Sequence, residues 1–464
     1  MRWLKRLLRR DDDELPADLQ ALAEQLGESS ADAWLRTPGG IQHLSDLRRS
    51  GQLSAEGEEQ IRLLQDEGLF PPDEADEHYQ ETEVNEKPSL RESTSNRGGR
   101  TLVVDPTASD AYQTISAAVA DAGDGDTVSV HHGRYTESVV IHRAMSVIGD
   151  GKRETIVVEG REAPCFILDH ATVRLANLTI EGGGPYANEL SAAVLIKGGA
   201  PTLERLELRE SHGIVVRDQA MPTIRGNIIR DGQGSGVSIG EGAGGTIEDN
   251  EIYGNAGGIM IADPGTSPTV RGNLISGGSF GVVVLTSAGG TIEDNQIYGN
   301  AHAGIMIADP GTSPTVRGNI IRDGQGSGVS IGEGAGGTIE DNEIYGNTSS
   351  GISISDPDTD PMVRGNIIRD GESSGVDITL LARGTIEDNE IYGNTGSGIS
   401  IFNAGKSMVR RNIIRDGLAF GLHVAHSASR IEDNQIFGNA AGGISIYKPG
   451  NKTRLQRNLV RDNG

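Results

Sequence analysis

The chain has 464 residues, of which 35% are apolar and only 4% aromatic, and its formal net charge is −25. Such a charge argues against nucleic acid as a partner, because nucleic-acid binders need clustered positive potential. The single cysteine, Cys165, excludes an intrachain disulfide framework and is expected to be a small buried side chain. No apolar run reaches membrane-spanning length.

Residues 1–70 are predicted to be helical. Met1 to Arg10 (MRWLKRLLRR) combines four apolar with five basic side chains, a pattern that could contact an anionic membrane surface weakly or form a solvated helical turn. Within 41–66, the stretch LSDLRRSGQLSAEGEEQIRLL resembles the small helical hairpin called SHOCT, and this resemblance implies association with partners. An ordinary two-helix hairpin is the alternative. A secretory signal pattern is not found, so we expect a cytoplasmic protein.

Residues 71–100 are acidic and then rich in Ser and Arg, which predicts a disordered linker. From 101 to 464 strand patterns dominate, and 101–150 is expected to hold an N-terminal cap and the first coils. Strands are predicted at 102–104, 127–130, 139–141 and 145–148, with a helix at 112–122. This order resembles the N-terminal segment of pectinesterases and other pectin-lyase-like β-helices. The resemblance implies that the helix covers the open end of the first coil, where an exposed strand edge would invite aggregation.

An asparagine recurs every 22 to 24 residues between Asn227 and Asn458. Each one follows a short apolar triplet such as Thr246-Ile247-Glu248 and precedes two more short strands separated by glycine-containing turns. Three short strands per period without a helix predict a right-handed parallel β-helix of roughly 13–15 coils, regular over 213–464. We expect the asparagines to stack in a column and to occupy a left-handed turn position, which Asn tolerates well.

A longer period is also present, because residues 222–255 recur at 314–347 with one change. Odd and even coils differ, so the repeating unit is two coils. Two residues before each Asn, basic and acidic side chains alternate, which predicts a charge ladder that specifies register. Its members are Arg225, Glu248, Arg271, Glu293, Arg317, Glu340, Arg364, Glu387, Arg410, Glu432 and, at the end, Gln456.

Three residues after each Asn, arginine and aromatic residues alternate at a spacing suited to cation–π stacking. This column is either an internal stacking ladder or a binding surface, since Tyr and Arg dominate binding hot spots. We call it the Arg/Tyr rail, and we expect Asp231, Asp323, Asp370 and Asp416 to hold its guanidinium groups. The candidate binding residues are Arg230, Tyr253, Tyr298, Arg322, Tyr345, Arg369, Tyr392 and Arg415.

The coil sequence, for example GIMIADPGTSPTVRGNLI, resembles the carbohydrate-binding and sugar-hydrolase (CASH) repeats and the β-helix of F-box substrate receptors. The latter resemblance implies binding of protein targets. IEDNQIFGNA at 431–440 resembles a pectinesterase stretch, but Asn434 stands at the catalytic Asp position. No catalytic residue, metal site or cofactor is therefore expected. His302, His423 and His426 are scattered rather than spaced as metal ligands.

The sequence favours a non-enzymatic β-helix scaffold that binds a protein or carbohydrate ligand along its side. Uniform, duplicated coils suit binding, whereas an active site is a unique constellation. The alternative is a polysaccharide-active enzyme (lyase, hydrolase or epimerase) that uses the less regular coils at 150–226. Because bare strand edges are pairing templates, we also expect end-on self-association through the last coil.

Overall fold

The computed structural model describes residues 99–160, 163–169, 172–183, 192–447 and 453–464. The predicted helical region 1–70 with its 41–66 hairpin, the Met1 to Arg10 segment and the linker up to residue 98 lie outside these residues.

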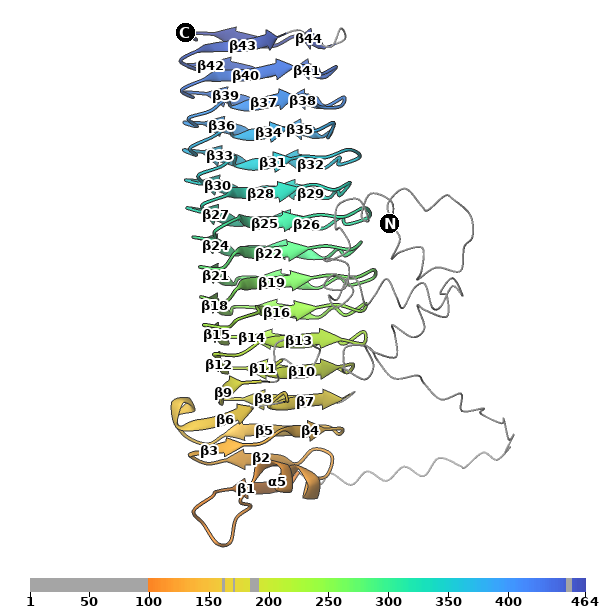
Figure 1. Ribbon diagram of the computed structural model, residues 1–464, viewed down its shortest axis with the longest axis vertical. Helices are drawn as coiled ribbons and strands as arrows, with labels where there is room; N and C mark the ends of the chain where they lie inside the picture. The colour runs from red at the N-terminus through yellow and green to blue at the C-terminus, as the bar shows by residue number, and fades with distance from the viewer. Residues whose placement is uncertain (1–98, 161–162, 170–171, 184–191, 448–452) are drawn as a thin grey trace, which may run out of the picture. The chain divides into compact units, whose positions relative to one another are not determined.

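The described chain winds into an all-β, right-handed solenoid of about 15 turns of about 23 residues (Figure 1). Each turn contributes one strand to each of three parallel sheets, which we call sheets 1, 2 and 3 in chain order. Every strand pairs with the strands three before and three after it in the regular coils. The β-helix predicted from the asparagine spacing is confirmed.

Sheet 1 consists of β1 (Thr101–Val104), β2 (Thr127–Val130), β5 (Met145–Gly149), β8 (Val173–Ala176), β11 (Thr202–Glu204), β14 (Thr223–Arg225), β17 (Thr246–Glu248), β20 (Thr269–Arg271), β23 (Thr291–Glu293), β26 (Thr315–Arg317), β29 (Thr338–Glu340), β32 (Met362–Arg364), β35 (Thr385–Glu387), β38 (Met408–Arg410), β41 (Arg430–Glu432) and β44 (Arg454–Gln456). Sheet 2 consists of β3 (Gly133–Thr136), β6 (Ile156–Gly160), β9 (Thr179–Gly182), β12 (Glu207–Arg209), β15 (Ile228–Arg230), β18 (Glu251–Tyr253), β21 (Leu274–Ser276), β24 (Gln296–Tyr298), β27 (Ile320–Arg322), β30 (Glu343–Tyr345), β33 (Ile367–Arg369), β36 (Glu390–Tyr392), β39 (Ile413–Arg415), β42 (Gln435–Phe437) and β45 (Leu459–Arg461). Sheet 3 consists of β4 (Val139–Ile141), β7 (Phe166–Asp169), β10 (Val194–Lys197), β13 (Ile214–Arg217), β16 (Ser235–Ile239), β19 (Gly257–Ile261), β22 (Phe280–Val284), β25 (Ala303–Ile307), β28 (Ser327–Ile331), β31 (Ile352–Ile354), β34 (Val376–Ile378), β37 (Ile399–Phe402), β40 (Phe420–Ala425) and β43 (Gly442–Tyr447). A 3-10 turn (η1, Arg153–Thr155) precedes β6.

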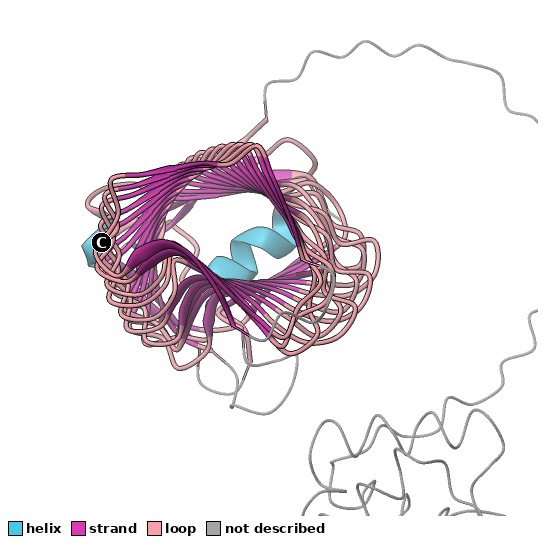
Figure 2. Ribbon diagram, turned by 90° about the horizontal axis from the view of Figure 1, so that it is seen from above, coloured by secondary structure: helices cyan, strands magenta, loops and turns pink. Residues whose placement is uncertain are grey.

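Helix α5 (Ile115–Asp121) lies across the N-terminal opening of the solenoid, as the view along the axis shows (Figure 2). Its side chains Ile115 and Ala118 are fully buried against the first coil, and Thr114 caps its N-terminus by accepting from the Ala117 amide. The helix predicted at 112–122 is therefore shorter than expected. The reason is Tyr112, whose backbone pairs with Val104 as a bridge before the helix begins.

The core is a stack of aliphatic side chains, one from the middle of each three-residue strand. Ile247 in β17 and Ile252 in β18, for example, are fully buried. Because each coil buries its core against its neighbours, little aromatic content is needed. Cys165 is fully buried as predicted, and this burial raises the pKa of its thiol to about 12. In the described part of the chain, no helix has the length and apolarity needed to cross a bilayer.

The predicted asparagine column is present, but its physical basis differs from the expectation. The left-handed position is taken by the residue before each Asn, for instance Gly226 (φ 58°) and Asp249 (φ 55°), and not by the Asn itself. The asparagines instead form side-chain hydrogen bonds with the neighbouring coils. Asn342, for example, accepts at Oδ1 from the Asn319 amide at 3.0 Å and donates from Nδ2 to the Asn366 Oδ1 at 2.9 Å.

A second asparagine column runs beside the turn between sheets 2 and 3. Its side chains accept from backbone amides of the preceding coil, as Asn347 does from Gly324 at 3.0 Å. Its members are Asn255, Asn300, Asn347, Asn394, Asn439 and Asn463. The first column ties each coil to the next through buried hydrogen bonds, and the second ties the coils mainly in pairs, because glycine takes the Asn position in alternate coils.

Candidate functional site

The predicted charge ladder is confirmed on sheet 1, where arginines form ion pairs with glutamates of the preceding coil. Arg271 donates from Nε to Glu248 at 2.9 Å, and Arg317 donates to Glu293 at 2.8 Å. Arg364 repeats this contact with Glu340 at 2.8 Å. Each arginine reaches back to the preceding coil, so the ladder joins coils two by two and fixes their register.

The Arg/Tyr rail lies on the outward side of sheet 2, where the register sets Tyr345 of β30 opposite Arg369 of β33. Guanidinium carbons lie 4.0 to 4.7 Å from the ring centroids of the preceding coil, within cation–π range. The stacked pairs are Arg322 on Tyr298, Arg369 on Tyr345, Arg415 on Tyr392 and Arg461 on Phe437.

The rail's guanidinium groups are also held by carboxylates. Arg369 donates to Glu343 of the preceding coil at 2.7 Å and to Asp370, its own neighbour, at 2.7 Å. The hydrogen bonds to Glu343 and then Asp370 raise the pKa of Arg369, although burial acts against them. Asp231, Asp323, Asp370 and Asp416 thus clamp their arginines as expected. Ligand binding by the eight rail residues stays a prediction.

In the less regular coils at 150–226, two glutamates are each held between two arginines. Glu181 contacts Arg134 and Arg209, and Glu204 contacts Arg174 and Arg225. Burial acts to raise the pKa of both carboxyls, but the hydrogen bonds and charges of the arginines outweigh it and lower both pKa values. Carboxylates kept ionised in this way tie coils together and are poor proton donors.

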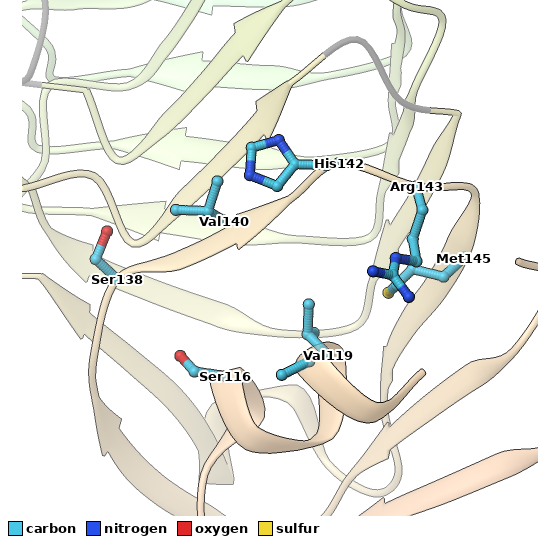
Figure 3. A pocket seen from close by; sticks show the side chains of 8 residues that line it. Ser116, Val119, Ser138, Val140, His142, Arg143 and Met145 are labelled. Carbon is cyan, nitrogen blue, oxygen red and sulfur yellow. The ribbon is translucent and has the colours of Figure 1, made fainter. Parts of the chain in front are cut away.

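A hollow of about 370 Å³ lies between α5 and β4. Figure 3 shows Ser116 and Val119 of the helix on one side and Val140 and His142 on the other. Its polar side chains already have partners: Ser116 hydroxyl bonds Glu137, and His142 lies 2.9 Å from Asp169. The hollow is the junction between the cap and the first coil.

The outward face of sheet 3 changes character toward the C-terminal end. In earlier coils its central column contains apolar residues such as Met260, Val283 and Met306, which are in register. From Ser330 onward this position is polar in every coil, and we call its last five members the polar column: Ser353, Asp377, Ser400, His423 and Ser445. All five are half-buried and alternate with fully or largely buried residues along their strands.

Two groups in the polar column are polar but partly removed from solvent. Burial raises the pKa of the Asp377 carboxyl, while a hydrogen bond with the Ser400 hydroxyl acts in the opposite direction. The Nδ1 of His423 is buried and has no hydrogen-bond partner in the described residues. Its ring stacks on Phe420 with centroids 6.0 Å apart.

An aromatic column lies beside the polar one. Phe402 and Tyr447 stand two residues beyond Ser400 and Ser445 on their strands, and His426 directly follows the buried Ala425, which is in register with both. Phe402 and Tyr447 are 51% and 56% exposed. The His426 ring lies between them, with centroids 6.0 Å from Phe402 and 6.3 Å from Tyr447. In the turn below, Leu380 and Leu381 are also exposed and both have left-handed backbones (φ 51° and 66°), a conformation that strains a bulky residue.

The two columns together form the C-terminal face, defined as Asp377, Ser400, Phe402, His423, His426, Ser445 and Tyr447. Part of it departs from the repeat. Asp377 and His423 stand where the duplicated coils carry Ser238 and Ser330, and Phe402 and Tyr447 stand where they carry Gly240 and Gly332. From the sequence, His423 and His426 were expected to be scattered rather than spaced as metal ligands. Aligning the coils by the 22-to-24-residue period places His423 in the polar column but sets Ala425, not His426, opposite Phe402 and Tyr447, so the period signalled only the first of the two histidines.

Within the described ranges, no three His, Cys, Asp or Glu side chains gather closely enough to hold a metal ion. Asn434, at the position of the pectinesterase acid, is a fully buried member of the asparagine column, bonded to Asn458 at 2.9 Å.

Solved structures with a similar fold include the Azotobacter vinelandii mannuronan C-5 epimerase AlgE6 A-module (16% identity, 75% of this chain and 94% of that chain covered, TM-score 0.40). Others are XylC with xylose (13%, 78% and 86%, TM-score 0.44) and the catalytic domain of an alpha-1,3-glucanase in complex with tetrasaccharides (12%, 81% and 71%, TM-score 0.36). At these identities and scores the similarity concerns the fold alone.

A search of curated proteins finds no match. The family model of the right handed beta helix region matches three overlapping stretches, 166–321, 212–358 and 308–460. These matches cover more than half of the chain and agree with the observed coils. The chain therefore belongs to the right-handed β-helix family.

Proposed function

We propose that the protein is a carbohydrate-binding β-helix that holds a polysaccharide on its C-terminal face. The observation that carries this proposal is the combination of a polar and an aromatic column on one outward face, in coils that depart from the repeat. The rest of the solenoid then serves as a rigid scaffold. The sequence favoured either a protein or a carbohydrate as the ligand, and of these two we propose the carbohydrate.

Sugar rings present hydroxyl groups at their edges and C–H groups on their faces, so they need hydrogen-bonding groups beside an apolar platform. Asp377, Ser400 and His423 supply donors and acceptors, and the rings of Phe402 and Tyr447 supply the platform. The polar groups repeat every roughly 4.8 Å along the axis, and the two rings lie two strand spacings, roughly 10 Å, apart. An extended chain of sugars can follow such a periodic face without a deep cleft.

Binding can be tested with the purified full-length protein on an array of polysaccharides that includes pectin, pectate and alginate. The double variant Phe402→Ala and Tyr447→Ala removes about 0.5–1.5 kcal/mol per ring, so we expect about 5- to 150-fold weaker binding. Met362→Ala, which removes a side chain of similar exposure (37%) on sheet 1, is the matched control and should bind normally. Absence of any polysaccharide ligand, or equal binding by both variants, would refute the proposal.

A polysaccharide-active enzyme is the second candidate, and Asp377 and His423 favour it. A carboxyl with a raised pKa can donate a proton, and the half-buried imidazole of His423, two coils away, is the candidate acceptor. Their strands are two spacings apart, roughly 10 Å at the backbone, which leaves room for one sugar ring between them.

Turnover separates the two candidates. As a binding protein, the purified chain should release neither unsaturated uronates, reducing ends nor methanol from pectin, pectate or alginate, with or without Ca²⁺. Reproducible turnover that disappears in Asp377→Asn, while that variant still binds the polymer, would replace the binding function by the enzymatic one.

A further inference from the structure

The Arg/Tyr rail on sheet 2 repeats one local arrangement, which we call a rung. In the rung of Arg369, the guanidinium lies over Tyr345 of the preceding coil, 4.0 Å from the ring centroid. It also donates to Glu343, two residues before that tyrosine, at 2.7 Å. Arg415 repeats both contacts, with Tyr392 at 4.1 Å and Glu390 at 2.8 Å.

One rung lacks its cation. The register places Ser276 between Tyr253 and Tyr298, where the other coils present arginine. The corresponding coil of the duplicated unit reads Ile367-Ile368-Arg369-Asp370, whereas this one reads Leu274-Ile275-Ser276-Gly277. Both the arginine and its aspartate clamp are therefore replaced by small residues.

The groups that would hold a guanidinium are retained around Ser276. Glu251, two residues before Tyr253, stands at the position of Glu343, and its carboxylate has no hydrogen-bond or ion-pair partner in the described residues. Tyr253 is 38% exposed, the most exposed tyrosine of the rail. The rung thus keeps a carboxylate and two rings but supplies no positive charge.

We propose that the rung at Ser276 binds the side chain of an arginine presented by a partner protein. The two tyrosines are separated by two strand spacings, roughly 9–10 Å, which admits one planar group in contact with both rings. Guanidinium is planar, stacks on aromatic faces and pairs with carboxylates, whereas an ammonium is a compact, strongly hydrated charge.

Internal copies supply the template for this contact. Arg322, in the coil above Tyr298, lies 4.6 Å from that ring and between it and Tyr345. The net charge of −25 attracts a basic partner over long range and adds nothing to recognition of a neutral one. This site lies on sheet 2 and does not depend on the carbohydrate-binding function assigned to sheet 3.

The test uses a capped peptide of glycines and serines with a single arginine, titrated into the full-length protein and followed by nuclear magnetic resonance. The citrulline peptide has a planar side-chain group like that of arginine but no charge. The lysine peptide has the positive charge but no planar group. We expect the arginine peptide to bind at least tenfold more tightly than the citrulline peptide, with the lysine peptide between them.

The decisive variant combines Ser276→Arg with Gly277→Asp, which restores the sequence of the neighbouring rungs. It leaves the net charge unchanged, and its melting temperature should equal or exceed that of the natural protein. It should weaken binding of the arginine peptide at least tenfold because the rung is then filled from within. Glu251→Gln should weaken the same binding without filling the rung.

Equal affinity for the citrulline and arginine peptides would overturn the proposal. Undiminished binding by the restored variant would do so as well. Binding of an oligomer of glucosamine, with no binding of the arginine peptide, would show that the rung recognises an amino sugar instead.

Discussion

Replacing Asn342 by leucine tests the asparagine column. The side chain is 2% exposed and takes part in five hydrogen bonds. Its Oδ1 accepts from the backbone and side chain of Asn319, and its Nδ2 donates to the Val316 and Glu340 carbonyls and to Asn366. Leucine removes all five contacts and leaves the Asn319 amide without its acceptor.

The free energy of unfolding should fall by about 6–8 kcal/mol, since each of the five lost bonds contributes about 1 kcal/mol and a buried amide without a partner costs about 1–3 kcal/mol. Urea unfolding followed by circular dichroism measures the change, with exposed Gln296→Leu as the control, expected within about 0.5 kcal/mol of the natural protein. Because solenoids unfold in parts, hydrogen exchange of the Asn319 amide provides the local measurement. A loss below about 1 kcal/mol, with unchanged exchange at Asn319, would refute this account of the column.

Two further predictions concern the charged groups. The Glu204 carboxyl has a lowered pKa in the folded protein, because Arg225 and Arg174 outweigh its burial. Its stabilising contribution is therefore complete above the unfolded pKa of about 4.3 and disappears as the pH falls below that value through the folded pKa. Accordingly, the stability difference between the natural protein and Glu204→Gln should be large at pH 7 and small near pH 3; a pH-independent difference would contradict the lowered pKa. On the rail, changing Tyr298, Tyr345 and Tyr392 together to alanine should cost about 1.5–3 kcal/mol in urea unfolding, at about 0.5–1 kcal/mol per stack. If ligand retention per folded molecule also falls, the rail binds as the sequence suggested; unaltered stability would rule out an internal stacking ladder.

The fold was accessible from the sequence because each coil repeats the same local rule. The period of the asparagines identified the strands on both sides of them, and the predicted strands at 127–130 and 139–141 match β2 and β4. The reason assigned to the asparagines was wrong, however. Period alone shows that a residue recurs but not which backbone conformation it has, and only the dihedral angles showed that Asp249, rather than Asn250, is left-handed.

The candidate sites were harder to predict for a different reason. The rail was found by reading one position along every coil, but its rungs depend on Glu343 reaching forward to Arg369, a contact between different positions of successive coils. The same limitation hid the C-terminal face, where His423 acquires meaning only beside Ser400 and Ser445. The exposure and burial of these side chains depend on the neighbouring coils, and so does the lack of a hydrogen-bond partner for the His423 Nδ1 atom. Such properties cannot be deduced from one position of the sequence.

The pairing of charges on sheet 1 also limits how this molecule can change its length during evolution. Removing the single coil that carries Arg271 would set Glu248 beside Glu293, and two like charges directly opposite each other destabilise a sheet. Insertions and deletions of two coils, about 46 residues, keep opposite charges adjacent and change the height of the solenoid by about 10 Å. Recombination in such two-coil steps would change the distance between helix α5 and the C-terminal face. The sequences of both ends would stay unchanged.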